Sequence, residues 1–268
     1  MNLGTRGYCG NPHELTIIGH SEGTVIAPRV AIDNNNTTTK VKNIVLMGIV
    51  AQNVRELLYF QDVITPVLYA EKVLDHDHNG LLSVSEAYKD PVFRSMVGDV
   101  LLALETTNRT KHQLNATYNT NNDTYISINN ELKPKLVEQH ESILDVKENK
   151  IWVESHDTLG PTSNIIGKVP SSTGILLLNG LNDSNTPVQQ AFLLQQKLTD
   201  INHPDHVLIT YPDLGHAFYP SSQWLDVFGP IEQYVLADLY AWLEAHSGFT
   251  QSPSPSSSFS NSSSTGQG

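Results

Sequence analysis

Cysteine and basic residues are both scarce in this chain. Its one cysteine, Cys9, cannot form an internal disulfide, so no disulfide framework holds the fold. The 16 Lys and Arg residues are outnumbered by 28 Asp and Glu residues, which gives a net charge of −12. A nucleic-acid groove needs clustered basic residues, and those of this chain are scattered. We therefore expect no nucleic-acid partner.

Segments that could enter a membrane are also missing from the sequence. No apolar run reaches the roughly eighteen residues that a membrane-spanning helix needs. Residues 1–6 do not begin a signal peptide. We expect a soluble protein of unknown compartment, and extracellular residence stays open if the true amino terminus lies upstream.

The composition does provide for one globular unit. Hydrophobic residues make up 39% of the 268 residues, enough to bury a sizeable core at this length. Residues 248–268 differ from the rest, because they are mostly Ser, Pro, Gly, Asn and Thr. That composition predicts a disordered tail.

The most informative motif is Gly-x-Ser-x-Gly at residues 19–23, which lies between two apolar runs. The run before it, 15–18, reads as a strand, and the run after it, 24–27, begins a helix. A strand, a tight turn and a helix in this order make a nucleophile elbow. The serine of such an elbow sits in a strained conformation with its hydroxyl clear of the sheet. Ser21 is therefore the candidate nucleophile.

Two residues further along the chain complete a catalytic order. The apolar run 174–180 reads as a strand, and Asp183 lies in the loop that follows it. The run 206–211 reads as another strand, and His216 lies in the loop after that one. A serine hydroxyl needs a base to accept its proton, and a catalytic histidine needs a carboxylate to hold its tautomer. The order Ser21, Asp183, His216 predicts a catalytic triad.

With these motifs the chain resembles the alpha/beta-hydrolase superfamily. The resemblance is to the group of esterases, dienelactone hydrolases and prolyl-oligopeptidase-like enzymes whose elbow reads Gly-His-Ser-x-Gly. The acid of that group lies in a Gly-x-x-Asp-x-x-x-Pro loop, here residues 180–187, and the base in a Gly-His pair, here residues 215–216. The resemblance covers residues 12–51 and 170–246. It implies an α/β fold in which the backbone N–H of Glu22 is an oxyanion donor.

The resemblance also implies how the chain is divided. Residues 1–51 carry the elbow strand, the elbow helix and the sixth strand of the hydrolase core, and residues 170–247 carry the rest of that core. Residues 52–169 read as an inserted helical cap. Trp152 in this cap is interpreted as a hinge anchor in preference to a pocket wall. Helical patterns in the cap cover residues 54–74, 91–105 and 131–147.

Only strands five to eight of a hydrolase sheet are accounted for. The expected fold class is therefore the carboxyl-terminal half of an α/β-hydrolase sheet with an inserted helical cap. The missing amino-terminal half would include the loop that donates the second oxyanion N–H. We interpret the chain as a fragment rather than a decayed copy, and we expect the elbow strand to be a bare sheet edge.

Residues 75–86 in the cap resemble an EF-hand calcium loop. The histidines of the loop take outward positions, and calcium prefers hard oxygen ligands, so zinc fits poorly. No second loop of this form appears in the sequence, which favours a structural calcium ion that stiffens the cap over a sensor. An acidic loop without metal is the other interpretation. The expected ligands are Asp75, Asp77, Asn79, the Leu81 carbonyl, Ser83 through water, and a bidentate Glu86.

The expected function is a serine hydrolase that acts through an acyl-serine intermediate on a carboxylic ester or a peptide-like amide. Ser21 attacks, His216 moves the proton and Asp183 orients the imidazole, without a cofactor for catalysis. An ester is the first choice of substrate. The competing hypothesis is a catalytically dead or truncated hydrolase that acts as a calcium-dependent binding module.

Overall fold

A computed structural model describes residues 14–97 and 125–246 of the chain, except for the side chains of Val84 and Glu86. The predicted tail, 248–268, lies outside the described residues. So does part of the helix expected over 91–105.

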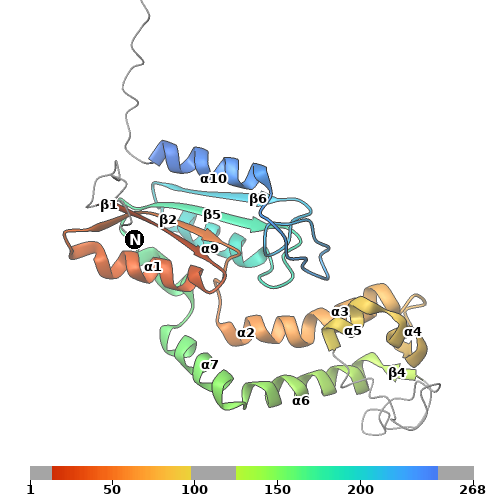
Figure 1. Cartoon of the computed structure of the whole chain (residues 1–268). Helices are drawn as coiled ribbons and strands as arrows, with labels where there is room; N and C mark the ends of the chain where they lie inside the picture. Colours follow the sequence, from red (N-terminus) through yellow and green to blue (C-terminus); the bar gives the residue numbers. More distant parts are fainter. Residues whose placement is uncertain (1–13, 98–124, 247–268) are drawn as a thin grey trace, which may run out of the picture.

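A four-stranded parallel sheet forms the centre of the fold (Figure 1). The strands lie in the order β1-β2-β5-β6, so β5 is flanked on both sides and every residue of it is buried. Among the described strands β1 is an edge, and its Leu15 and Ile18 side chains are about half exposed. The bounds are Glu14–His20 for β1, Lys40–Met47 for β2, Gly174–Gly180 for β5 and His206–Tyr211 for β6.

Helices cover both faces of this sheet because successive strand side chains point to opposite faces. Ile44 and Leu46 of β2 pack with α1 (Gly23–Asp33) and α9 (Gln189–Asp200) on one face. Val45 and Met47 pack on the other face, where α10 (Gln233–His246) contributes Val235 and Trp242. Figure 1 shows α10 on one side of the sheet and α1 and α9 on the other. This layered α/β arrangement agrees with the predicted fold class at the level of an α/β-hydrolase fold.

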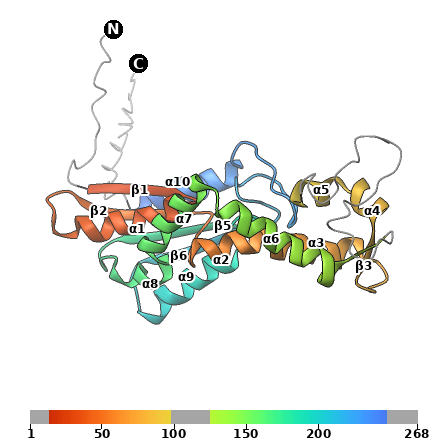
Figure 2. The same ribbon diagram turned by 90° about the horizontal axis from the view of Figure 1, so that it is seen from below.

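We call residues 52–169 the helical insertion; α2, α3 and α6, which belong to its described part, extend away from the sheet (Figure 2). The insertion begins with one continuous helical rod over residues 54–74, the range predicted from the sequence. Two stretches of the rod are wide π-helical turns, and the first of them ends directly before Thr65 and Pro66. Proline has no backbone N–H, so a locally widened turn suits this position. The rod comprises α2 (Val54–Tyr59), η2 (Phe60–Ile64), α3 (Thr65–Tyr69) and η3 (Ala70–Leu74).

Further helices complete the helical insertion around a core of its own. Val67, Leu82, Phe93, Ile126 and Leu136 are all buried in this core, which is separate from the two cores of the sheet. Leu82 and Ile126 face each other across a short antiparallel pair, β3 (Leu81–Ser83) and β4 (Tyr125–Ser127). The helices are α4 (Val84–Lys89), α5 (Pro91–Val97), η4 (Ile128–Leu132), α6 (Lys133–Leu144) and α7 (Lys147–Leu159).

The chain leaves the sheet for the insertion and returns to it at nearly the same point. Ser163, in α8 (Thr162–Ile165), donates its backbone N–H to the carbonyl of Ala51 at 2.9 Å. Close by, Arg29 of α1 donates to the carbonyls of Leu159 and Gly160 at the end of α7, at 2.8 and 2.6 Å. The short turns η1 (Asn34–Asn36) and η5 (Ile166–Lys168) complete the fold. In the part of the chain that the structure describes, no helix is long and apolar enough to cross a membrane.

Candidate active site

Ser21 occupies the sharp turn that the elbow motif predicts. It follows β1 and precedes α1, and its φ of 55° lies in the left-handed region that a non-glycine residue rarely adopts. Its backbone N–H donates to the Met47 carbonyl at 2.9 Å, which fixes the turn to the neighbouring strand. A Cβ at Gly19 would lie 2.3 Å from the Gly23 carbonyl oxygen, so only glycine allows the strand and helix to approach. A Cβ at Gly23 would meet open space, so that glycine is not required by packing.

Asp183 and His216 meet as the sequence predicts. Both residues follow neighbouring parallel strands, so their loops leave the same edge of the sheet. His216 Nδ1 lies 3.0 Å and 3.2 Å from the two carboxylate oxygens of Asp183. The Asp183 side chain is 1% exposed and the His216 side chain 7% exposed. A buried carboxylate on Nδ1 leaves Nε2 as the nitrogen that can take up a proton.

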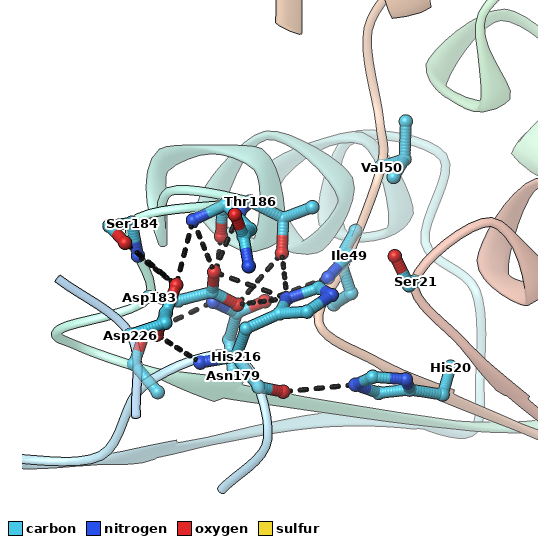
Figure 3. Close-up of polar contacts among 12 residues, drawn as sticks. His20, Ser21, Ile49, Val50, Asn179, Asp183, Ser184, Thr186, His216 and Asp226 are labelled. Atoms are coloured by element: carbon cyan, nitrogen blue, oxygen red, sulfur yellow. Dashed lines mark hydrogen bonds and ion pairs between the residues drawn. The ribbon is translucent and has the colours of Figure 1, made fainter. Parts of the chain in front are cut away.

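Thr186 contacts both Asp183 and His216, and the sequence analysis did not predict this role. Its hydroxyl donates to Asp183 Oδ2 at 2.7 Å and lies 3.1 Å from His216 Nδ1. The backbone N–H groups of Asn185 and Thr186 donate to Asp183 Oδ1 at 3.0 and 2.6 Å. These bonds hold the carboxylate of the buried Asp183 in one orientation (Figure 3).

The environment of His216 favours its protonated form. Burial alone would stabilise the neutral ring, but the hydrogen bond and the charge of Asp183, with the charge of Asp226, outweigh it. The pKa of His216 therefore lies above its usual value. Such a histidine is suited to taking up a proton during an attack by serine, because the resulting imidazolium is stabilised.

Two residues frame the His216 ring from the elbow side. Gly48, at the end of β2, has a φ of +59°, and a Cβ there would lie 2.9 Å from His216 Cε1. Only glycine therefore leaves room for the ring. His20 donates from Nε2 to the His216 carbonyl at 2.9 Å, and the two ring centroids lie 4.7 Å apart. The sequence did not indicate that Gly48 would contact His216, because this glycine was only the last residue of a predicted strand.

Ser21 and His216 open into one cavity of about 230 Å³. Its apolar wall comes from Val25, Val50, Val54 and Leu57. Figure 3 draws no hydrogen bond between Ser21 and His216, although both face this space. Catalytic hydrogen bonds are often long without substrate, so this arrangement is compatible with transfer of the serine proton.

Four backbone amides near the cavity are already bonded to side chains. The N–H groups of Ile49 and Val50 donate to the side chains of Asn179 and Thr24, and those of the next two residues donate to Gln190. They are therefore not available to an oxyanion. Among the described residues, no acceptor is bonded to the N–H of Glu22, directly after Ser21. This amide is the candidate donor that the sequence predicted.

The side chain of Glu22 joins the elbow to the helical insertion. One carboxylate oxygen accepts from Trp152 Nε1 at 3.0 Å and from His156 Nε2 at 2.8 Å, and both donors lie on α7. The hydrogen bond from His156, aided by Trp152 and opposed by partial burial, holds the pKa of Glu22 below its usual value. Trp152 also lines the cavity, which agrees with the pocket wall that the sequence analysis placed second, and its role as a hinge anchor stays a prediction.

The predicted calcium ligands are only partly brought together. Asp75, Asp77, Asn79, Leu81 and Ser83 line one open cavity, and Gly80 makes the sharp turn at a φ of +79°. The Asp75 carboxylate accepts from the N–H groups of Asn79 and Gly80, at 3.0 and 2.9 Å. The side chain of Glu86 lies outside the described part.

Three features of this loop bear on the metal prediction. Within residues 14–97 and 125–246, no group of three or more His, Cys, Asp or Glu is placed to hold a metal. His76, expected to point outward, also lines the loop cavity. The side chains present supply hard oxygen donors and therefore suit calcium by type.

Comparison with known proteins places the chain in a family. The model of the prolyl oligopeptidase family matches residues 116–250, which is half of the chain and includes Asp183 and His216 but not Ser21. No curated protein matches the sequence.

The solved structures that are similar to this chain include three hydrolases. An α/β hydrolase from a Medee basin deep-sea metagenome library is 16% identical, with a TM-score of 0.39, over 90% of this chain and 67% of its own. The monoacylglycerol lipase of Paleococcus ferrophilus is 15% identical, with a TM-score of 0.39, over 88% and 70%. A thermophilic esterase of Thermogutta terrifontis is 12% identical, with a TM-score of 0.40, over 88% and 66%.

The chain thus spans about two thirds of the length of the solved proteins it matches. Because these TM-scores are low, the assignment of the fold depends on the sheet topology and on the family match. The parallel sheet, the contact between the loops of Asp183 and His216, and the range of the family match agree with one another. The chain belongs to the prolyl oligopeptidase family and is a hydrolase of the α/β-hydrolase superfamily.

Proposed function

We propose that this chain is a serine hydrolase that cleaves a carboxylic ester, or a peptide-like amide, through an acyl-serine intermediate. The observation that carries the proposal is the arrangement around one cavity. Ser21 is held at a φ of 55° on its rim, and His216, bonded to the buried Asp183, faces the same space. A nucleophile, a base and an orienting carboxylate in these roles make up a catalytic triad.

Each step of the proposed reaction has a residue to carry it. His216 Nε2 takes the proton of Ser21 as the hydroxyl oxygen bonds to the substrate carbonyl carbon. The backbone N–H of Glu22 donates to the oxyanion of the tetrahedral intermediate. His216 then gives its proton to the leaving group, which leaves an acyl-serine, and water reverses the sequence to release the acid.

An ester is the preferred substrate on physical grounds. Ester carbonyls are more reactive than amide carbonyls, so they depend less on oxyanion stabilisation. Glu22 supplies the candidate oxyanion donor, while the four amides of residues 49–52 are already bonded to side chains. A second donor is worth roughly 3 to 4 kcal/mol in comparable sites, and amide cleavage would need it more.

The direct test is labelling with a fluorophosphonate probe, which reacts only with an activated serine. The unmodified chain is expected to be labelled and Ser21→Ala is expected to show no labelling. Ser155→Ala is the matched control, since Ser155 is an exposed serine on α7 that bonds only to its own helix. Labelling that survives in Ser21→Ala, or an unmodified folded chain that is not labelled, would rule out the nucleophile. The latter result would favour the inactive, calcium-dependent binding module.

We also propose a structural calcium ion at residues 75–86. Asp75, Asp77, Asn79 and Glu86 would supply side-chain oxygens and Leu81 its carbonyl, with Ser83 acting through water. The support is the open cavity that five of these residues line and the turn at Gly80. Calorimetry should detect binding of calcium to the unmodified chain, and Glu86→Gln should weaken it strongly. No calcium heat with the folded chain would refute the site.

Finally, we propose that this sheet is the carboxyl-terminal half of a hydrolase sheet and that the helical insertion is its cap. The half-exposed Leu15 and Ile18 on the edge strand support this. A protein extended upstream in the same reading frame should label faster and aggregate less than this chain. Equal labelling rates and a stable monomer for both would refute the proposal.

A further inference from the structure

A second carboxylate lies beside the catalytic pair, and the triad does not account for it. Asp226 belongs to the segment after β6, ten residues beyond His216 in sequence. We propose that Asp226 is a positioning residue that fixes the loop of the acid against the loop of the base. The inference rests on the proposed function, because it assigns how Asp183 and His216 are held for catalysis.

The contacts of Asp226 reach both catalytic loops. Its Oδ2 accepts from the Ser184 backbone N–H at 3.1 Å, from the Ser184 hydroxyl at 2.7 Å and from the Asn185 N–H at 3.1 Å. Its Oδ1 accepts from the backbone N–H of His216 at 2.7 Å. One carboxylate therefore bonds to the residue after the acid and to the base itself (Figure 3). Hydrogen bonds to an ionised acceptor are the stronger kind.

The two carboxylates of the site also share a donor. The N–H of Asn185 lies 3.0 Å from Asp183 Oδ1 and 3.1 Å from Asp226 Oδ2. Displacing Asp226 would therefore change the bonding of the catalytic acid as well as that of the base. Errors of about 1 Å in such a site can cost on the order of 100-fold in rate.

Gly215 gives independent support for the role of Asp226. A Cβ at this position would lie 2.0 Å from Asp226 Oδ1 and 2.5 Å from Ser221 Oγ. No side chain can stand there unless Asp226 moves away from His216. The glycine of the Gly-His pair is therefore explained by the close approach of Asp226, which needs that space.

The charge of Asp226 adds to that of Asp183. Both carboxylates stabilise the protonated ring, which contributes to the raised pKa of His216. Asp226 is therefore expected to influence when the base titrates as well as where it sits. A residue that only fills space or stabilises the fold would not move this pKa.

The test compares Asp226→Asn with a matched control, Asp213→Asn. Asp213 is an exposed carboxylate in the same segment and at a positive φ that asparagine tolerates. An asparagine at 226 has one oxygen and one amide group, so it cannot accept on both sides. We expect its fluorophosphonate labelling rate to fall about 10- to 100-fold. The His216 pKa, followed by NMR of the ring, should fall, and Asp213→Asn should change neither.

Gly215→Ala is a second route to the same displacement. It should lower the labelling rate and the His216 pKa in the same direction without removing any charge. An Asp226→Asn protein that is folded and keeps the wild-type rate and pKa would overturn the proposal. A loss of rate with an unchanged pKa would also overturn it, since that would indicate a structural role alone.

The NMR titration needs no catalysis, so it separates this inference from the proposed function. If the unmodified chain is not labelled, the proposed function fails while the pKa comparison still decides the role of Asp226. If the unmodified chain is labelled and Asp226→Asn behaves like Asp213→Asn, only the inference about Asp226 fails.

Discussion

Replacing Gly48 with alanine adds one methyl group at the point where the backbone meets the base. The new Cβ would lie 2.9 Å from His216 Cε1 and 3.0 Å from Nδ1, so the ring must move by several tenths of an ångström. The φ of +59° adds a backbone cost of about 1–2 kcal/mol. Since a displacement near 1 Å can cost on the order of 100-fold, we expect the labelling rate of Gly48→Ala to fall about 10- to 100-fold.

The control for this variant is Gly160→Ala. Gly160 has a similar φ of +71°, but a Cβ there meets open space. Gly160→Ala should lose at least as much stability in urea unfolding as Gly48→Ala, because the ψ of 174° at Gly160 places it in a backbone region that is essentially restricted to glycine. Only Gly48→Ala should label slowly. If the two variants label equally fast, contact between Gly48 and the His216 ring does not set the position of the base.

Three further predictions concern the same site. Thr186→Val removes the hydroxyl that bonds the buried Asp183, and urea unfolding should show a loss of about 1–3 kcal/mol; no loss would mean that another donor replaces it. The labelling rate should rise with pH, with its midpoint at a His216 pKa above the usual 6.5. The stability that the raised pKa of His216 contributes is complete below pH 6.5 and is lost as the pH rises through the pKa of the folded state. A labelling midpoint below pH 6.5 contradicts this prediction. Trp152→Phe removes one donor to the exposed Glu22 and should cost less than about 1 kcal/mol in unfolding; a larger loss would show that this contact holds α7 in place.

The core of the site could be predicted because it depends on local patterns. The apolar runs 174–180 and 206–211 became strands with those same bounds. Parallel strands bring their carboxyl ends to one edge, so residues that follow them in sequence meet in space. The pairing of Asp183 with His216 therefore followed from two short runs and the loops after them.

The supporting residues could not be predicted because their roles depend on tertiary contacts. Thr186, Gly48 and Asp226 have no sequence pattern of their own, and each is identified by what it touches. The helix α7, with Trp152, was missed for a related reason. Its apolar residues are few, and Ile151, Trp152 and Val153 are adjacent in sequence instead of three or four residues apart.

The pairing of β3 with β4 aligns the EF-hand-like loop with a second Asp- and Asn-containing stretch of the sequence. Leu82 lies opposite Ile126, so the residues before each can be compared at equal offsets. Before Leu82 these are Asp75, Asp77 and Asn79. Before Ile126 they are Asn119, Asn121 and Asp123, which lie outside the described residues. Thr124 stands where the first loop has Gly80, and Asn130 stands where it has Glu86; these departures explain why the sequence indicated only one EF-hand-like loop.

The hydrogen bond between Ser163 and Ala51 has a consequence for how this molecule tolerates change. This bond brings Ser163, six residues before the end of the helical insertion, next to Ala51, directly before its start, so the insertion leaves and rejoins the sheet at neighbouring points. The entropy of closing a loop grows only with the logarithm of its length. Segments could therefore be lengthened, shortened or exchanged at this junction while the strands keep their register.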